Sequence, residues 1–244
     1  MNANEHWLVP DWPAPDHIKA ATTLRTGGVS ASPYASFNSA LHVGDQRDRV
    51  LQNRQLLKAR LNLPDEPLWL SQIHSNVVID AAKSARLQEA DASYTMQTGI
   101  VCTVMTADCL PLLVCDKEGI CVAAIHAGWR GLAAGIITNT IKALPIADLM
   151  VWLGPAIGPE SFEVGKEVRD AFKKKSEINL TAFKQVSDEK WLADIYQLAR
   201  HELMELGIDQ VYGGNFCTVT DSARFYSYRR DNVTGRMATL IWKN

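Results

Sequence analysis

The chain has 244 residues, of which 47% are hydrophobic and 21% charged, and its formal net charge is −2. Such a composition supports an ordinary buried core. It offers no basic excess for binding nucleic acid and no run of about 18 apolar residues for a membrane span. Five cysteines without regular spacing predict reduced thiols rather than a disulfide framework. Because the first 15 residues lack the cationic and apolar regions of a signal peptide, we expect a cytoplasmic protein.

The N-terminal part predicts an arm, a strand and a long loop. Pro, Trp and Asp residues within 1–17 are typical of an extended surface arm, and residues 18–26 have the apolar content of a strand. Arg25 ends that strand and either faces a cleft or is solvated. The polar segment 32–46 lacks periodicity, and a loop of that length is usually functional or disordered. Its aromatic residues favour an ordered loop. It carries two candidate binding residues, Asn38 and His42.

Hydrophobic periodicity in the remainder predicts helices that alternate with hairpins. The predicted helices cover residues 45–63, 129–144, 164–175 and 194–206. The predicted strands cover residues 68–73, 77–80, 100–105, 110–115, 120–125, 149–153, 210–212, 225–228 and 237–242. Asp194 and Gln197 resemble a capping box at the start of the last helix. Because single strands and helices do not alternate regularly, we predict one domain, residues 1–244, of α/β (α+β) class with mixed, largely antiparallel sheets.

A predicted hairpin in the middle of the chain brings a cysteine towards a histidine. Two apolar runs, 110–115 and 120–125, flank the turn 116–119. Folding about the middle of that turn places Cys109 opposite His126, with Cβ atoms roughly 4.5–5.5 Å apart. Such a pair can share a metal or act as nucleophile and base. A register slip of one residue would turn Cys109 or His126 to the other face of the hairpin. A buried Cys or a His at a strand end is also often purely structural.

Two further candidates lie in turns. His74 is in the turn 72–76 between two predicted strands, and on its own it is a weak candidate. Residues 128–131 form the corner between the hairpin and the next helix, and they include Arg130. Free N–H groups at a helix N-terminus beside an arginine favour an anion, although most helix ends bind only water.

Five segments, in this order and at this spacing, resemble the YfiH, or laccase-domain, family. They are QIH at 72–74, TADCLP at 106–111, IHAGWRG at 125–131, LGPAIGP at 153–159 and SYRRDNVTGRM at 227–237. The resemblance covers nearly the whole chain. It implies a four-layer α/β/β/α sandwich related to the cysteine-hydrolase domain of a bacterial toxin.

The resemblance also implies a metal centre. His74, Cys109 and His126 match the family's zinc ligands, with copper as an alternative occupant in vitro. Three protein ligands leave one tetrahedral position open, which is typical of a catalytic zinc site. A zinc ion in such a site lowers the pKa of bound water to about 7.

Members of this family have been described as purine nucleoside phosphorylases with adenosine deaminase activity and as polyphenol oxidases. We therefore expect an enzyme acting on purine nucleosides and phosphate, as a monomer or weak homo-oligomer. Zinc deaminases use a carboxylate that is not a ligand to move protons, and Asp108, Asp91 and Glu163 remain equal candidates. The expected catalytic residues are His74, Cys109, His126 and Asp108. The expected substrate and phosphate residues are Arg25, Asn38, His42 and Arg130.

Three alternatives stay open. The first is a cysteine or zinc amidohydrolase acting on a peptidoglycan precursor; in its metal-free form Cys109 is the nucleophile and His126 the base. The second is a copper-dependent polyphenol oxidase, although six histidines in the whole chain are too few for a multicopper cluster. A module that only binds ligands is the third, and an open metal site argues against it.

Overall fold

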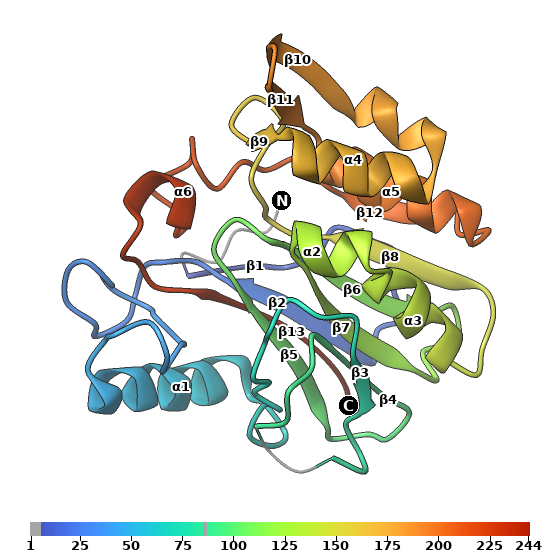
Figure 1. The fold of residues 1–244 in the computed structure, drawn as a ribbon. Helices are drawn as coiled ribbons and strands as arrows, with labels where there is room; N and C mark the ends of the chain where they lie inside the picture. Colours follow the sequence, from blue (N-terminus) through green and yellow to red (C-terminus); the bar gives the residue numbers. More distant parts are fainter. Residues whose placement is uncertain (1–5, 85–86) are drawn as a thin grey trace.

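Two large β-sheets packed face to face form the centre of the molecule (Figure 1). The structure is a computed structural model and describes residues 6–84 and 87–244. Its strands are β1 (Trp7–Leu8), β2 (Ile18–Thr23), β3 (Val78–Asp80), β4 (Ala92–Thr95), β5 (Val101–Thr106), β6 (Leu110–Asp116), β7 (Val122–Ala127), β8 (Leu149–Leu153), β9 (Glu163–Gly165), β10 (Phe183–Ser187), β11 (Lys190–Ala193), β12 (Val211–Gly213) and β13 (Met237–Lys243). Its helices are α1 (Arg47–Leu61), α2 (Trp129–Ala133), α3 (Ile136–Ala143), α4 (Lys166–Lys175), α5 (Ile195–Glu205), α6 (Tyr228–Asp231) and the 3₁₀ helix η1 (Glu177–Ala182).

The six-stranded sheet has the order β12-β8-β6-β7-β4-β3. Only its outer pairs, β12 with β8 and β3 with β4, are parallel. One face packs against α2, α3, α4 and α5 through residues such as Leu112, Ile125 and Val151. The other face packs against the second sheet. Because both faces are covered, its central strands β6 and β7 are apolar except for Asp116 and His126 near their ends, rather than alternating with polar residues.

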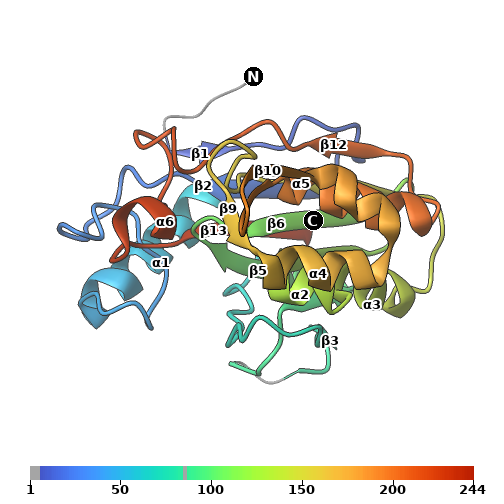
Figure 2. The same cartoon turned by 45° about the horizontal axis from the view of Figure 1, so that its top comes forward.

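The four-stranded sheet has the order β1-β2-β13-β5 and completes the sandwich. Cys102, Leu113 and Ile241 are buried between the two sheets. On the outer face of the second sheet, Leu57 of α1 packs with Leu240 of β13. Helix α1 therefore lies on the opposite side of the molecule from α2–α5 (Figure 1 and Figure 2). This order of layers confirms the expected mixed, mostly antiparallel α/β/β/α sandwich.

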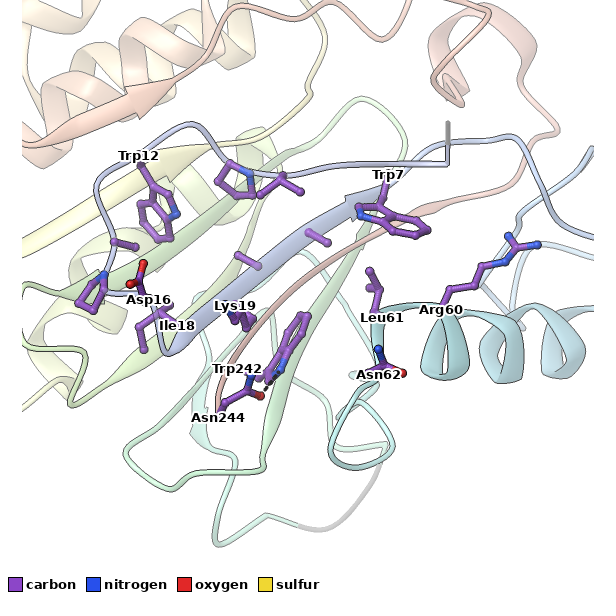
Figure 3. Close-up of a pocket in the computed structure, with 16 residues that line it drawn as sticks. Trp7, Trp12, Asp16, Ile18, Lys19, Arg60, Leu61, Asn62, Trp242 and Asn244 are labelled. Carbon is purple, nitrogen blue, oxygen red and sulfur yellow. Dashed lines mark hydrogen bonds between the residues drawn. The ribbon is translucent and has the colours of Figure 1, made fainter. Parts of the chain in front are cut away.

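The N-terminal arm runs across the edge of the four-stranded sheet. Strand β1 pairs with β2 only at Trp7 and Leu8, and Pro10, which lacks an N–H group, occupies the next position that would bond to β2. Beyond this point the arm leaves the strand and borders an open hollow of about 520 Å³ lined by Trp7 and Trp12 (Figure 3). Trp242 closes its floor, and its Nε1 donates to Asn244 Oδ1. The described part of the arm confirms the predicted extended segment; residues 1–5 lie outside the described residues.

Three predicted elements differ from the structure. Residues 68–73 form isolated bridges, Leu68 with Cys102 and Ser71 with Glu89, instead of a strand. The predicted strand 225–228 is wrong, because Ser227 caps the short helix α6 by accepting from the N–H of Arg230. The predicted helix 129–144 is interrupted at Gly135, whose φ of +87° separates α2 from α3. Among the described residues, no helix is long and apolar enough to cross a membrane.

Candidate metal centre and its two hollows

The central hairpin has a different register from the one the sequence predicts. Strand β6 pairs with β7 so that Pro111, rather than Cys109, lies opposite His126. The turn is longer than predicted because the Asp116 carboxylate accepts N–H groups from Glu118 and Cys121, which keeps Cys121 outside β7. The shift is two residues, which preserves the face of the sheet. Cys109 therefore still reaches His126, although the predicted pairing was wrong.

Three side chains converge at the end of this hairpin. One donor atom each from His74, Cys109 and His126 lies within 4.8 Å of the other two, and Cys109 Sγ is 3.7 Å from His74 Nε2. With ordinary Zn–S and Zn–N bond lengths, a tetrahedral zinc separates a sulfur and a nitrogen ligand by about 3.6 Å. The donor set and the separation of Cys109 Sγ from His74 Nε2 therefore fit one zinc ion. We call these three residues the ligand trio.

A buried carboxylate holds two members of the trio. Asp91, which is fully buried, accepts a hydrogen bond from His126 Nδ1 at 2.8 Å, so His126 Nε2 is the nitrogen left for a metal. The same carboxylate accepts the backbone N–H groups of His74 and Ser75 and the Ser75 hydroxyl. Burial alone would raise the pKa of Asp91, but these hydrogen bonds lower it to about 2. Asp91 thus stays ionised and orients the ligands, as the outer partner of a metal-bound histidine does.

Gly128 lets the backbone pass close to the trio. A Cβ atom at this position would lie 2.8 Å from His74 Cδ2 and 3.0 Å from Cys109 Sγ. The φ of Gly128 is −64°, so a side chain is excluded by space rather than by backbone conformation. The sequence suggested an anion site at this corner, but the helix that follows has only five residues. The structural purpose of the glycine is therefore to make room for the ligands.

Charges within the trio favour a thiolate. Burial raises the pKa of Cys109, but the positive charge and hydrogen bond of His126, together with the hydrogen bond of His74, lower it overall. For His126, burial lowers the pKa, whereas the Cys109 thiolate and Asp91 raise it above its usual value. The metal-free protein therefore holds a thiolate–imidazolium pair. The thiolate is also the form in which cysteine binds a metal.

Two hollows meet at the trio and share His74, Ala107, Cys109 and Tyr228. The first, which we call the Trp129 hollow, has a volume of about 250 Å³. Its remaining lining is mainly apolar and aromatic: Asp108, Trp129, Arg130, Ile157, Phe162, Ile195 and Arg229. The second, the Arg236 hollow, measures about 360 Å³. Its remaining lining is more polar: His42, Gln72, Met105, Thr106, His126 and Arg236.

The four expected substrate residues separate in the structure. His42 lines the Arg236 hollow and Arg130 lines the Trp129 hollow. Arg25 lines neither, and its guanidinium donates to the carbonyl oxygens of Ala35 and Ser222. Asn38 is fully buried and also lines neither hollow. Its side chain bonds to Ala40, Asp45 and the N–H of Arg236, so it fixes the long loop against β13.

The three candidate carboxylates also separate. The Asp91 carboxylate is occupied by its hydrogen bonds to His126, His74 and Ser75. Asp108 lines the Trp129 hollow, and its two oxygens accept from the Thr218 hydroxyl and the Arg229 N–H, each at 2.6 Å. Glu163 is exposed beside Lys190 and lines neither hollow. Asp108 is therefore the one of the three that borders the space beside the trio.

Several lining residues were not singled out from the sequence. Tyr228 and Arg236 lie within the segment 227–237, which served only to suggest the family. Phe162 follows another such segment, and Gln72 begins the QIH motif. The signal in the sequence that could have identified these lining residues was their position in or beside the family motifs. Sequence spacing alone does not place residues 72, 162 and 236 around one site.

The electrostatics predict selective alkylation of two cysteines. Burial raises the pKa of Cys102, Cys115 and Cys121 to about 12, so these thiols stay protonated at pH 7. For Cys217, hydrogen bonds outweigh burial and lower the pKa to about 7. We expect iodoacetamide at pH 7 to label Cys109 and Cys217 in metal-free protein. Added zinc should protect Cys109 alone, as peptide mass spectrometry can measure. Equal labelling of Cys109 with and without zinc would contradict metal binding by its sulfur.

Together, the fold and the trio define an α/β/β/α sandwich with one candidate mononuclear His₂Cys centre among the described residues. The family described as "Multi-copper polyphenol oxidoreductase laccase" matches residues 19–244. The chain belongs to this laccase-domain family, which includes the YfiH proteins.

Similar proteins extend over nearly the full length of the chain. A Pseudomonas aeruginosa protein named a purine nucleoside phosphorylase is 51% identical and covers 99% of both chains. Escherichia coli YfiH, also named a purine nucleoside phosphorylase, is 49% identical over 96% of this chain and 98% of its own. The crystal structure of a Neisseria meningitidis protein is 48% identical, with a TM-score of 0.95 over 98% of this chain and 99% of that one.

Proposed function

We propose that this protein is a zinc-dependent purine nucleoside phosphorylase. The observation that carries the proposal is the position of the trio, at the junction of an aromatic hollow and a hollow containing Arg236. A purine nucleoside has a flat apolar base, and its co-substrate phosphate is an anion, so the two hollows suit the two substrates. The names of the relatives at 49–51% identity support the same reaction.

In phosphorolysis, an oxygen of hydrogen phosphate bonds to C1′ of the ribose as the C1′–N9 bond breaks. The electron pair of that bond leaves with the purine, which takes up the proton from the phosphate. The products are ribose 1-phosphate and the free base. A bound zinc would supply a Lewis acid that stabilises developing negative charge.

The residues of the chain have separate tasks in this proposal. His74, Cys109 and His126 hold the metal, and Asp91 fixes the orientation of His126. Trp129 and Phe162 offer aromatic surfaces to a purine. Arg130 and Arg236 each line one hollow and offer a positive charge to phosphate.

Product analysis tests the proposal. The zinc-loaded protein should convert inosine to hypoxanthine and ribose 1-phosphate only when phosphate is present, as mass-resolved chromatography would show. A chelator should abolish turnover, and zinc should restore it. Full phosphorolysis by metal-free protein would contradict the zinc mechanism, and the absence of product from any nucleoside would contradict the phosphorylase.

Adenosine deamination is a second candidate because Asp108 borders the Trp129 hollow beside the trio. In this candidate reaction its carboxylate would move a proton between water and the amino group on C6 of adenine. Adenosine incubated without phosphate should then give inosine and ammonia. Asp108→Asn should reduce this reaction more than it reduces phosphorolysis of inosine, which has no amino group to release.

A multicopper mechanism has less support. A multicopper oxidase needs several metal ions with mainly histidine ligands, whereas the described residues contain one group of three donors. Copper can occupy a His₂Cys site in competition with zinc, because many donor sets bind copper more strongly. The rate of phenol oxidation should therefore be measured for the copper-loaded and the zinc-loaded protein at equal metal occupancy.

A further inference from the structure

The Arg236 hollow has the lining expected of an oxyanion site. No Asp or Glu side chain is among its described lining residues, and Arg236 contributes a permanent positive charge next to Cys109 and His74. A divalent metal bound by one thiolate and two neutral imidazoles would add a net charge of about +1 to the same wall. The Trp129 hollow differs, because Asp108 contributes a carboxylate there.

The guanidinium of Arg236 is held in place and still has donors available. Its Nη1 donates to the carbonyl oxygens of Thr234 and Gly235, each at 3.0 Å, and its backbone N–H is held by Asn38. No described residue accepts from its Nε or Nη2. A guanidinium fixed at one nitrogen and free at two others matches the bidentate geometry that phosphate prefers.

A hydroxyl without a partner lies in the same wall. Thr106 ends β5 opposite Met237, the first residue of β13, and it is 2% exposed. Its Oγ1 has no hydrogen-bond partner among the described residues. An unpaired buried hydroxyl is unfavourable, and an anion in this hollow would offer it an acceptor. Arg236 and Thr106 are close because β5 and β13 pair up to this point.

We propose that inorganic phosphate occupies the Arg236 hollow, held by Arg236 and Thr106, while the purine base lies in the Trp129 hollow. This inference rests on the proposed phosphorylase function and assigns an orientation to its substrates. The ribose then spans the trio, with the phosphate on the opposite side of the ribose from the base. That arrangement brings a phosphate oxygen to C1′ on the side away from the breaking C1′–N9 bond.

The test compares matched arginine variants of the zinc-loaded protein. Arg236→Gln should raise the KM for phosphate roughly ten- to a hundredfold, the effect of losing a charge-assisted hydrogen bond, and should change the KM for inosine little. Arg200→Gln is the control, because Arg200 also donates to two backbone carbonyls but lines neither hollow. Equal phosphate KM values in both variants would overturn the inference.

A second pair of variants changes no charge. Thr106→Val removes the unpaired hydroxyl in the hollow, and Thr103→Val removes another buried, unpaired hydroxyl of β5 that lies outside both hollows. Both should fold at least as well as the wild type. Only Thr106→Val should raise the KM for phosphate, and the same result for both variants would exclude a role for Thr106.

Binding is measured separately from turnover. Inorganic phosphate should raise the melting temperature of the wild type and of Arg200→Gln, but not of Arg236→Gln. If the wild type cleaves no nucleoside, the proposed function fails, and this measurement alone decides the phosphate site. A melting temperature raised by inosine 5′-monophosphate but not by inorganic phosphate would show that the hollow holds a nucleotide phosphate, which also overturns the inference.

Discussion

Cys109→Ala is expected to remove bound zinc and to lower kcat/KM by more than about a hundredfold. Loss of an outer-shell partner commonly costs 10–100-fold in metal affinity or activity, and Cys109 is itself a proposed ligand. The folded state should tolerate the change, because Cys109 is only partly buried and Asp108 keeps its bonds to Thr218 and Arg229. Metal content by mass spectrometry and phosphorolysis rates provide the measurement.

Cys217→Ala is the matched control, since Cys217 is also a partly buried cysteine with a lowered pKa but lies outside both hollows. It should retain its zinc and its activity. If Cys109→Ala keeps zinc but loses turnover, Cys109 acts as a nucleophile rather than as a ligand. Full activity in Cys109→Ala would contradict both mechanisms.

Asp91→Ala is expected to reduce stability by about 3–5 kcal/mol, because it leaves His126 and several N–H groups buried without their shared acceptor. Zinc affinity should fall as well, roughly 10–100-fold. Chemical denaturation and zinc titration measure the two effects. Glu163→Gln, which changes an exposed carboxylate outside the hollows, should alter neither. Normal zinc affinity in Asp91→Ala would contradict the orienting role.

The Asp91 carboxylate should also make stability depend on pH. Its pKa in the folded protein is about 2, below the ordinary value of 3.8. The folded state therefore binds the proton less readily than the unfolded state. The contribution of Asp91 is fully present above about pH 4 and is lost as the pH falls towards 2. Asp91→Ala should flatten this part of the acid-unfolding curve.

The family resemblance implied the four layers of the fold, and the sequence pattern located most helices and strands but not every strand register. Apolar runs and helical periodicity predicted β8, α1 and α5 closely, because these elements are buried in a regular pattern. The hairpin register depended on one side chain, Asp116, which organises the turn by hydrogen bonds. A two-residue error preserves the face of a strand, so the proximity of Cys109 and His126 survived it.

The site was harder to predict because its contacts join distant segments. The family resemblance supplied His74, but nothing in the sequence showed that Asp91 would bind both its backbone and His126. Asn38 was expected at the substrate because it is a polar residue in a long loop. The structure uses it instead to attach that loop to Arg236. Local patterns do not distinguish a buried structural amide from one that faces a ligand.

The strand order of the smaller sheet has a consequence for how the protein is made. Strand β13, residues 237–243, lies between β2 and β5. Until the ribosome has produced residues 237–243, β5 has no partner in this sheet and β2 can pair only with the two residues of β1. The chain closes long loops in this step, which slows folding relative to local pairing. Arg236 directly precedes β13, so the proposed phosphate site forms only when this late strand inserts.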